Sequence, residues 1–102
     1  MPKADLARWG NRQKRLSHFR KHGPLLNQQD VDDYDKSARA TIRAGKRFTY
    51  EDTTAGEQRV GYYDRHLERL TALDEVEETI VTHFRCPERY VRSLPASDYS
   101  RR

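Results

Sequence analysis

Apolar positions in the first part of the chain recur every three or four residues on an otherwise basic segment, as in an amphipathic helix. The pattern predicts a helix over residues 11–22. Gly23-Pro24 should end it, because glycine accepts a left-handed cap and proline cannot continue the hydrogen-bond ladder. The positions that recur at this spacing and build the stripe are Leu6, Trp9, Gln13, Leu16 and Phe19 or Arg20.

A second helix is predicted between Asn27 and Gly45. Asn27 can cap its N-terminus, and Asp30, three residues further on, suits the positive end of the helix dipole. Gly45 is a natural stop. The stripe expected to be buried consists of Val31, Tyr34, Ala38 and Thr41/Ile42.

The apolar period changes to two after Gly45, which is typical of β-strands. Residues 79–85 form the clearest strand, since their β-branched content suits a central position in a sheet. Gly61 could mark a bulge. The four predicted strands are residues 47–51, 59–64, 70–74 and 79–85.

Alternation assigns the side chains of the last strand to two faces. Ile80, Thr82 and Phe84 should share one face, and Val81, His83 and Arg85 the other. Thr82 and His83 therefore cannot both face one cleft unless a bulge intervenes. Tyr62 and Tyr63 likewise point to opposite faces, which predicts one in the core and one facing solvent or RNA.

The element order predicts an α+β fold in which two N-terminal helices pack on a four-stranded antiparallel sheet. The length of 102 residues suits a single domain over residues 1–102. Residues 1–10 and 93–102 are expected to be loose tails.

Composition excludes several protein classes. Hydrophobic residues make up 34% and charged residues 35%, with a mean hydropathy of −1.13, so the core must be small. No apolar run approaches the length of a membrane helix or secretory signal, so we expect a cytoplasmic protein, bacterial or delivered into a target cell. The single cysteine, Cys86, excludes an internal disulfide, and no Cys/His cluster has structural-zinc spacing.

The distribution of charge along the chain indicates the kind of molecule that the protein binds. Residues 1–47 carry 12 basic and five acidic side chains, whereas the remainder is acidic on balance. Such a basic front attracts polyanions, most commonly phosphate backbones, although a solvated helix face would have the same composition. The basic segment, residues 12–22, contains Arg12, Lys14, Arg15, Arg20 and Lys21 together with His18 and His22.

Several motifs in this order resemble small toxin nucleases of the barnase–EndoU–colicin–RelE-like fold, found at the tips of bacterial polymorphic toxins and in prophage regions. The resemblance covers roughly residues 16–91. Its motifs are the run His18–Gly23, an alanine-containing helix over residues 30–44, the aromatic–Asp step in residues 61–64, the strand 70–74, the strand 79–84 and the downstream Tyr90.

The resemblance implies helices against an antiparallel sheet and a metal-independent ribonuclease, acting without a cofactor, whose active site lies across the sheet. Lys21 and His22 match its first motif, Thr82 and Phe84 match its last strand, and Tyr90 matches the aromatic residue after it. Thr82 would then hydrogen-bond the scissile phosphate, although threonine is also common in strands for its β-propensity.

RNA cleavage without a metal needs a base for the 2′-hydroxyl, an acid for the leaving 5′-oxygen and cations for the phosphoryl oxygens. Histidine suits both proton-transfer roles. We expect His22 to be base or acid, although a histidine at a helix C-terminus is also favoured by the dipole. His18, four residues earlier, is a second candidate that could instead face the interior, and the pair lacks a third ligand for a metal site.

Candidate RNA-binding residues come from the basic segment and from the strands. Arg12, Lys14 and Arg15 would contact phosphates along a helix face. Arg59 and Arg85 could clamp phosphate, or be ordinary surface residues, and Tyr90 could stack a base or pack over the sheet edge. Trp9, Phe19, Tyr34, Phe48 and Phe84 are assigned to packing.

The leading hypothesis is a toxin-like ribonuclease acting on RNA, with transfer RNA as one candidate substrate. The alternatives are a non-catalytic nucleic-acid-binding protein and a virion-associated interaction module on the same fold. An acidic immunity or antitoxin protein would suit the basic face. The substrate, the cleavage site, the oligomeric state and the assignment of base and acid are left open by the sequence.

Overall fold

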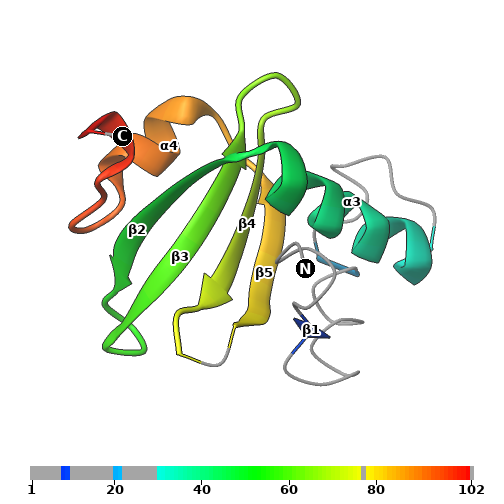
Figure 1. Ribbon diagram of the computed structural model, residues 1–102, viewed down its shortest axis with the longest axis horizontal. Helices are drawn as coiled ribbons and strands as arrows, with labels where there is room; N and C mark the ends of the chain where they lie inside the picture. The colour runs from blue at the N-terminus through cyan, green and yellow to red at the C-terminus, as the bar shows by residue number, and fades with distance from the viewer. Residues whose placement is uncertain (1–7, 10–19, 22–29, 77, 102) are drawn as a thin grey trace.

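The computed structural model describes residues 8–9, 20–21, 30–76 and 78–101, and it is an α+β fold in which a helix packs on an antiparallel sheet (Figure 1). The predicted arrangement of two N-terminal helices is wrong: in the described residues one helix precedes the main strands and the other follows them. Most of the predicted helix over 11–22 lies outside the described residues, where only Arg20 and Lys21 are seen, with helical backbone.

Helix α3 spans Val31–Ala44 and has a defined cap at each end. The Asp33 backbone N–H donates to the Asp30 side chain over 2.8 Å, so Asp30 is itself the N-cap. The cap expected at Asn27 lies outside the described residues. At the other end, the Gly45 N–H donates to the Thr41 carbonyl over 2.7 Å, and the predicted stop is confirmed.

Five strands form one sheet in the order β1-β5-β4-β3-β2. Strands β2 to β5 are an antiparallel meander, and the four predicted strands are confirmed within two residues at each end. Strand β1 was not predicted: it pairs in parallel with β5, placing Trp9 beside Ile80 in a segment expected to be helical or loose. The bounds are β1 Arg8–Trp9, β2 Lys46–Asp52, β3 Glu57–Asp64, β4 Arg69–Asp74 and β5 Thr79–Arg85.

Helix α3 covers one side of the sheet, which we call the helix face (Figure 1). Tyr34 and Ala38 are fully buried there, as the predicted stripe requires. The Trp9 ring stacks on Tyr34 at 5.6 Å, so β1 closes this core at the β5 edge. The buried set is Trp9, Tyr34, Ala38, Ile42, Val60, Tyr62, Leu73 and Ile80.

The opposite side, the far face, has a second core under the C-terminal segment. Helix α4, Glu88–Ser93, and the 3₁₀ helix η2, Tyr99–Arg101, supply Val91 and Tyr99 to this core. Their partners include Phe48, Tyr63 and Leu70.

The segment after α4 also pairs with the exposed edge of β2. The Glu51 N–H donates to the Pro95 carbonyl over 2.8 Å, and the Thr49 N–H donates to the Asp98 carboxylate over 2.8 Å. Residues 93–101 were expected to be a loose tail, but they are packed because these bonds satisfy an edge that water would otherwise solvate. With the far face covered, Tyr62 and Tyr63 are both buried, so the prediction that one faces solvent or RNA is wrong.

Gly61 does not mark a bulge, since β3 pairs regularly on both sides there. The Phe48 ring lies directly over it, and a Cβ at position 61 would come within 2.5 Å of that ring. The glycine is therefore required by packing.

In the described part of the chain, no helix is long and apolar enough to cross a membrane.

Candidate functional site

A bulge in β5 decides which side chains reach the far face. Ala72 pairs with Thr82, whereas the next β4 residue, Leu73, pairs with Ile80, so Val81 is an extra residue. Ile80 therefore packs in the helix-face core while Thr82 lies on the far face. The prediction that Ile80 shares a face with Thr82 and Phe84 is wrong, because simple alternation assumes no extra residue.

Thr82 and Phe84 lie on the far face of β5, and Phe84 contacts Tyr90 of α4. Phe84 is two residues from Thr82 on the same side of β5, and both are half-buried. The rings of Phe84 and Tyr90 meet edge to face at 5.6 Å, and Tyr90 is 41% exposed. The three residues that match the resemblance's last motifs thus lie on one side of the sheet, with Phe84 between Thr82 in sequence and Tyr90 in space.

Tyr50 in β2 was not among the predicted site residues; it packs against the same far-face core as Phe84 and lies near enough to Tyr90 for the charge of that phenol to raise its pKa. Its ring stacks on Phe48 at 5.8 Å and is partly exposed. Burial raises the pKa of the Tyr50 phenol to about 12, with the charge of Asp52 adding to the effect and that of Arg59 opposing it. Burial also raises the Tyr90 pKa. Both phenols therefore stay protonated at neutral pH and can donate hydrogen bonds to phosphate oxygens.

We call Tyr50, Thr82, Phe84 and Tyr90 the aromatic patch. Partly exposed rings with hydroxyl donors suit a single-stranded nucleic acid, whose bases stack on aromatic side chains. Tyr50 could have been found from the sequence, since it lies two residues after the core residue Phe48 and so shares its face.

His83 lies on the opposite side of β5 and is sealed in the core. It is fully buried, with Nε2 at 2.8 Å from Ser37 Oγ and Nδ1 at 2.7 Å from Thr71 Oγ1. The Tyr34 hydroxyl donates to its carbonyl. The bulge at Val81 precedes both residues, so Thr82 and His83 still lie on opposite sides of β5, and His83 joins α3 to the sheet.

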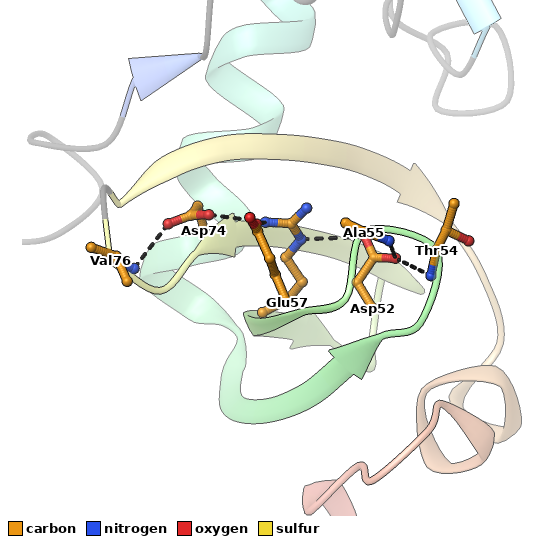
Figure 2. Close-up of polar contacts among 7 residues, drawn as sticks. Asp52, Thr54, Ala55, Glu57, Asp74 and Val76 are labelled. Carbon is orange, nitrogen blue, oxygen red and sulfur yellow. Dashed lines mark hydrogen bonds and ion pairs between the residues drawn. The ribbon is translucent and has the colours of Figure 1, made fainter.

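Arg59 forms ion pairs with three carboxylates, and Figure 2 labels these three residues as Asp52, Glu57 and Asp74. Its Nη1 lies 3.0 Å from both Glu57 and Asp74, and its Nε lies 3.4 Å from Asp52. The residue is only 8% exposed. Its guanidinium therefore stabilises the sheet, and the phosphate clamp expected of it would require breaking these three ion pairs.

The same carboxylates also fix two hairpin turns. Asp52 accepts the backbone N–H groups of Thr54 and Ala55, and Asp74 accepts that of Val76 (Figure 2). Arg59 thus holds the ends of the β2–β3 and β4–β5 hairpins together.

Arg85 points to the same side of β5 as His83, away from the aromatic patch. Its guanidinium is exposed and pairs with Glu68 over 3.2 Å. The structure therefore does not bring Arg85 together with Thr82 and Tyr90.

The expected catalytic and binding residues of the basic segment are mostly undescribed. His18, His22, Arg12, Lys14 and Arg15 lie outside the described residues. Lys21 is described and exposed. Among the described residues, no group of three or more His, Cys, Asp or Glu side chains is placed to hold a metal ion.

No family model matches the chain, and no curated protein or solved structure is significantly similar to it.

Proposed function

We propose that the protein is a metal-independent ribonuclease that holds RNA on the aromatic patch. The observation that carries the proposal is that the half-buried Thr82 and Phe84 share the far face of β5, where Phe84 contacts the exposed ring of Tyr90. In this proposal the Tyr90 ring stacks a base and the Thr82 hydroxyl donates to the scissile phosphate.

The groups that move protons would come from the basic segment. His22 would take the 2′-hydroxyl proton or supply the proton of the leaving 5′-oxygen, with His18 as its partner and Lys21 neutralising the phosphoryl charge. Trp9, at the end of β1, pairs with Ile80 of β5, which is two residues before Thr82, so the described residues on the N-terminal side of the basic segment reach the β5 edge of the sheet.

A non-catalytic RNA-binding protein is the second candidate, and one observation favours it. The two described histidines, His66 and His83, lie in the β3–β4 turn and in the core, so neither is on the far face beside Thr82. Binding without cleavage would need only the aromatic patch and the positive charge of the N-terminal half.

Two properties separate these functions: affinity for an RNA that cannot be cut, and cleavage of one that can. A 2′-O-methyl oligonucleotide lacks the attacking hydroxyl, so it measures affinity alone. A ribonuclease predicts that His22→Ala keeps this affinity and stops cleavage of unmodified RNA. A binder predicts that the wild-type chain binds and does not cut.

Variants of the patch test where the RNA lies. Tyr90→Ala should weaken binding of the 2′-O-methyl oligonucleotide by about tenfold, because a stacked base contributes on the order of 1–3 kcal/mol. Thr82→Val should reduce cleavage with little change in binding, whereas Thr53→Val, an exposed turn substitution, should change neither. Unchanged binding in Tyr90→Ala would place RNA elsewhere on the molecule.

A further inference from the structure

A hollow of about 350 Å³ opens at one end of the sheet, apart from the aromatic patch residues. It lies where α3 ends and β2 begins, beside the β3–β4 turn, and the C-terminal elements α4 and η2 form its other wall. Its size is at the lower end of the range for small-ligand sites.

Basic side chains dominate this hollow. Lys46 of β2, Arg65 and His66 of the β3–β4 turn, and Arg92 of α4 all line it, and all four are exposed. They come from three separate parts of the chain, so their convergence is a product of the fold. No run of basic residues in the sequence indicates it.

Two carboxylates also line the hollow, and both have partners. Asp64 accepts the backbone N–H groups of His66 and Leu67 at 3.0 and 3.2 Å, which shapes the turn. Glu88 accepts the Tyr99 hydroxyl at 3.0 Å and lies 3.5 Å from Arg92. With three permanent cations against two such carboxylates, the hollow keeps a positive charge.

Buried tyrosines form part of the lining and position the cations. Tyr63 and Tyr99 are almost fully buried. Lys46 Nζ lies 4.7 Å from the centre of the Tyr99 ring, and the Arg92 guanidinium carbon lies 5.4 Å from it. A single ring thus holds two of the charges.

Arg65 and His66 complete the set. Within the described residues, neither the Arg65 guanidinium nor the His66 imidazole has a hydrogen-bond or ion-pair partner. Arg65 lies close enough to Tyr99 for its charge to lower the pKa of that phenol, against the larger effect of burial. Five guanidinium N–H groups and an imidazole N–H are therefore available on one side of a hollow whose other side is also cationic.

We propose that this hollow is a binding site for a phosphate group. A tetrahedral anion with several oxygens can accept from a guanidinium fork, an ammonium and an imidazole at once, which a single carboxylate cannot do as fully. The group could be the end of an RNA strand, an internal phosphate or a free nucleotide. The site does not depend on whether the protein cleaves RNA.

The test compares two variants that each lose two positive charges. Lys46→Gln/Arg65→Gln removes cations of the hollow. Lys36→Gln/Arg47→Gln removes exposed cations of α3 and β2 outside it, and Arg47 is the strand neighbour of Lys46 that points to the other face. The probes are adenosine 5′-monophosphate and 2′-O-methyl oligonucleotides with a 5′-phosphate or a 5′-hydroxyl, and the Kd is measured by calorimetry or fluorescence anisotropy.

The first variant should weaken binding by about tenfold and the second by less than about twofold. The backbone amides of residues 65–67 in the wild-type protein should change chemical shift on addition of the same probes that bind with measurable Kd. If the oligonucleotide with a 5′-phosphate binds more tightly than the one with a 5′-hydroxyl, the site binds the end of a strand. If both oligonucleotides bind equally, the site binds an internal phosphate. Tight binding of adenosine 5′-monophosphate identifies a free nucleotide as the ligand. Equal losses in both variants, or no binding of any probe, would overturn the proposal.

Discussion

The Nε2 atom of His83 lies 2.8 Å from the Oγ of Ser37, which joins the middle of β5 to the middle of α3. Thr71 in β4 holds the other ring nitrogen at 2.7 Å. An imidazole in such a place is fully desolvated, and its polar atoms depend on these hydroxyls. The histidine that is nearest in sequence to the proposed phosphate contact, Thr82, therefore belongs to the scaffold.

Ser37→Ala should lower the free energy of unfolding by about 1–3 kcal/mol, because it leaves Nε2 of a buried imidazole without this partner. Urea unfolding followed by circular dichroism measures the change. Thr53→Ala, an exposed turn substitution, should cost less than about 0.5 kcal/mol. Equal effects of the two variants would show that the Ser37–His83 contact contributes nothing.

Gly61→Ala should destabilise the protein by about 3 kcal/mol, since the added methyl group would meet the buried Phe48 ring. Gly56→Ala is the matched control. Gly56 has a φ of 68° but open space around it, so alanine there should cost only about 1 kcal/mol through backbone strain. Thermal melting of both variants gives the comparison, and a smaller loss at position 61 than at 56 would contradict the packing explanation.

Arg59→Met should lower the free energy of unfolding by about 3 kcal/mol, because the carboxylates of Asp52, Glu57 and Asp74 would lose the guanidinium that neutralises their charge. Arg85→Met removes an exposed ion pair with Glu68 and should cost less than about 1 kcal/mol. Affinity for a 2′-O-methyl oligonucleotide should fall no further in Arg59→Met than in Arg85→Met. A selective loss of RNA binding in folded Arg59→Met would instead restore the phosphate-clamp role.

Alkaline pH should destabilise the protein through groups that ionise more easily once unfolded. Burial, together with the charge of Glu68, raises the Cys86 pKa to about 12 from an ordinary value of 9.0. Tyr50 is raised to about 12 from 10.0. Because both folded-state values are raised, their contribution is fully present below about pH 9 and is lost as the pH rises toward 12.

The midpoint of urea unfolding should accordingly fall as the pH increases above about 9. Cys86→Ala should show a shallower fall, since the thiol no longer contributes to it. A midpoint that is constant or rises over this interval would contradict the burial of these two groups.

Much of the sheet was predictable because the four meander strands are rich in β-branched and aromatic residues and are bounded by turn residues. The helix that ends at Gly45 was also predictable from a local signal, since its apolar residues recur at a helical spacing and a glycine follows them. The C-terminal segment was not, since its packing depends on Tyr99 and Val91 reaching across the sheet to Phe48 and Tyr63. Such long-range contacts leave little periodic signal in a short polar stretch.

In the candidate site, too, the features set by local sequence were predictable and those set by long-range contacts were not. The placement of Thr82 and His83 on opposite sides of β5 follows from alternation. The bulge at Val81 does not, and this bulge puts Ile80 and Thr82 on opposite sides of the sheet. The sequence also could not indicate that Arg59 would meet three carboxylates, because Asp52, Glu57 and Asp74 belong to two different hairpins.

The most direct test of the proposed ribonuclease is the chemistry of its products. Purified protein is incubated with transfer RNA and with total RNA in excess EDTA, and the new 3′ ends are analysed by mass spectrometry. Attack by the 2′-hydroxyl predicts 2′,3′-cyclic phosphate ends, formed without metal and lost in His22→Ala. RNA that stays intact from about pH 5 to 8, or cleavage that EDTA abolishes, would contradict the proposal.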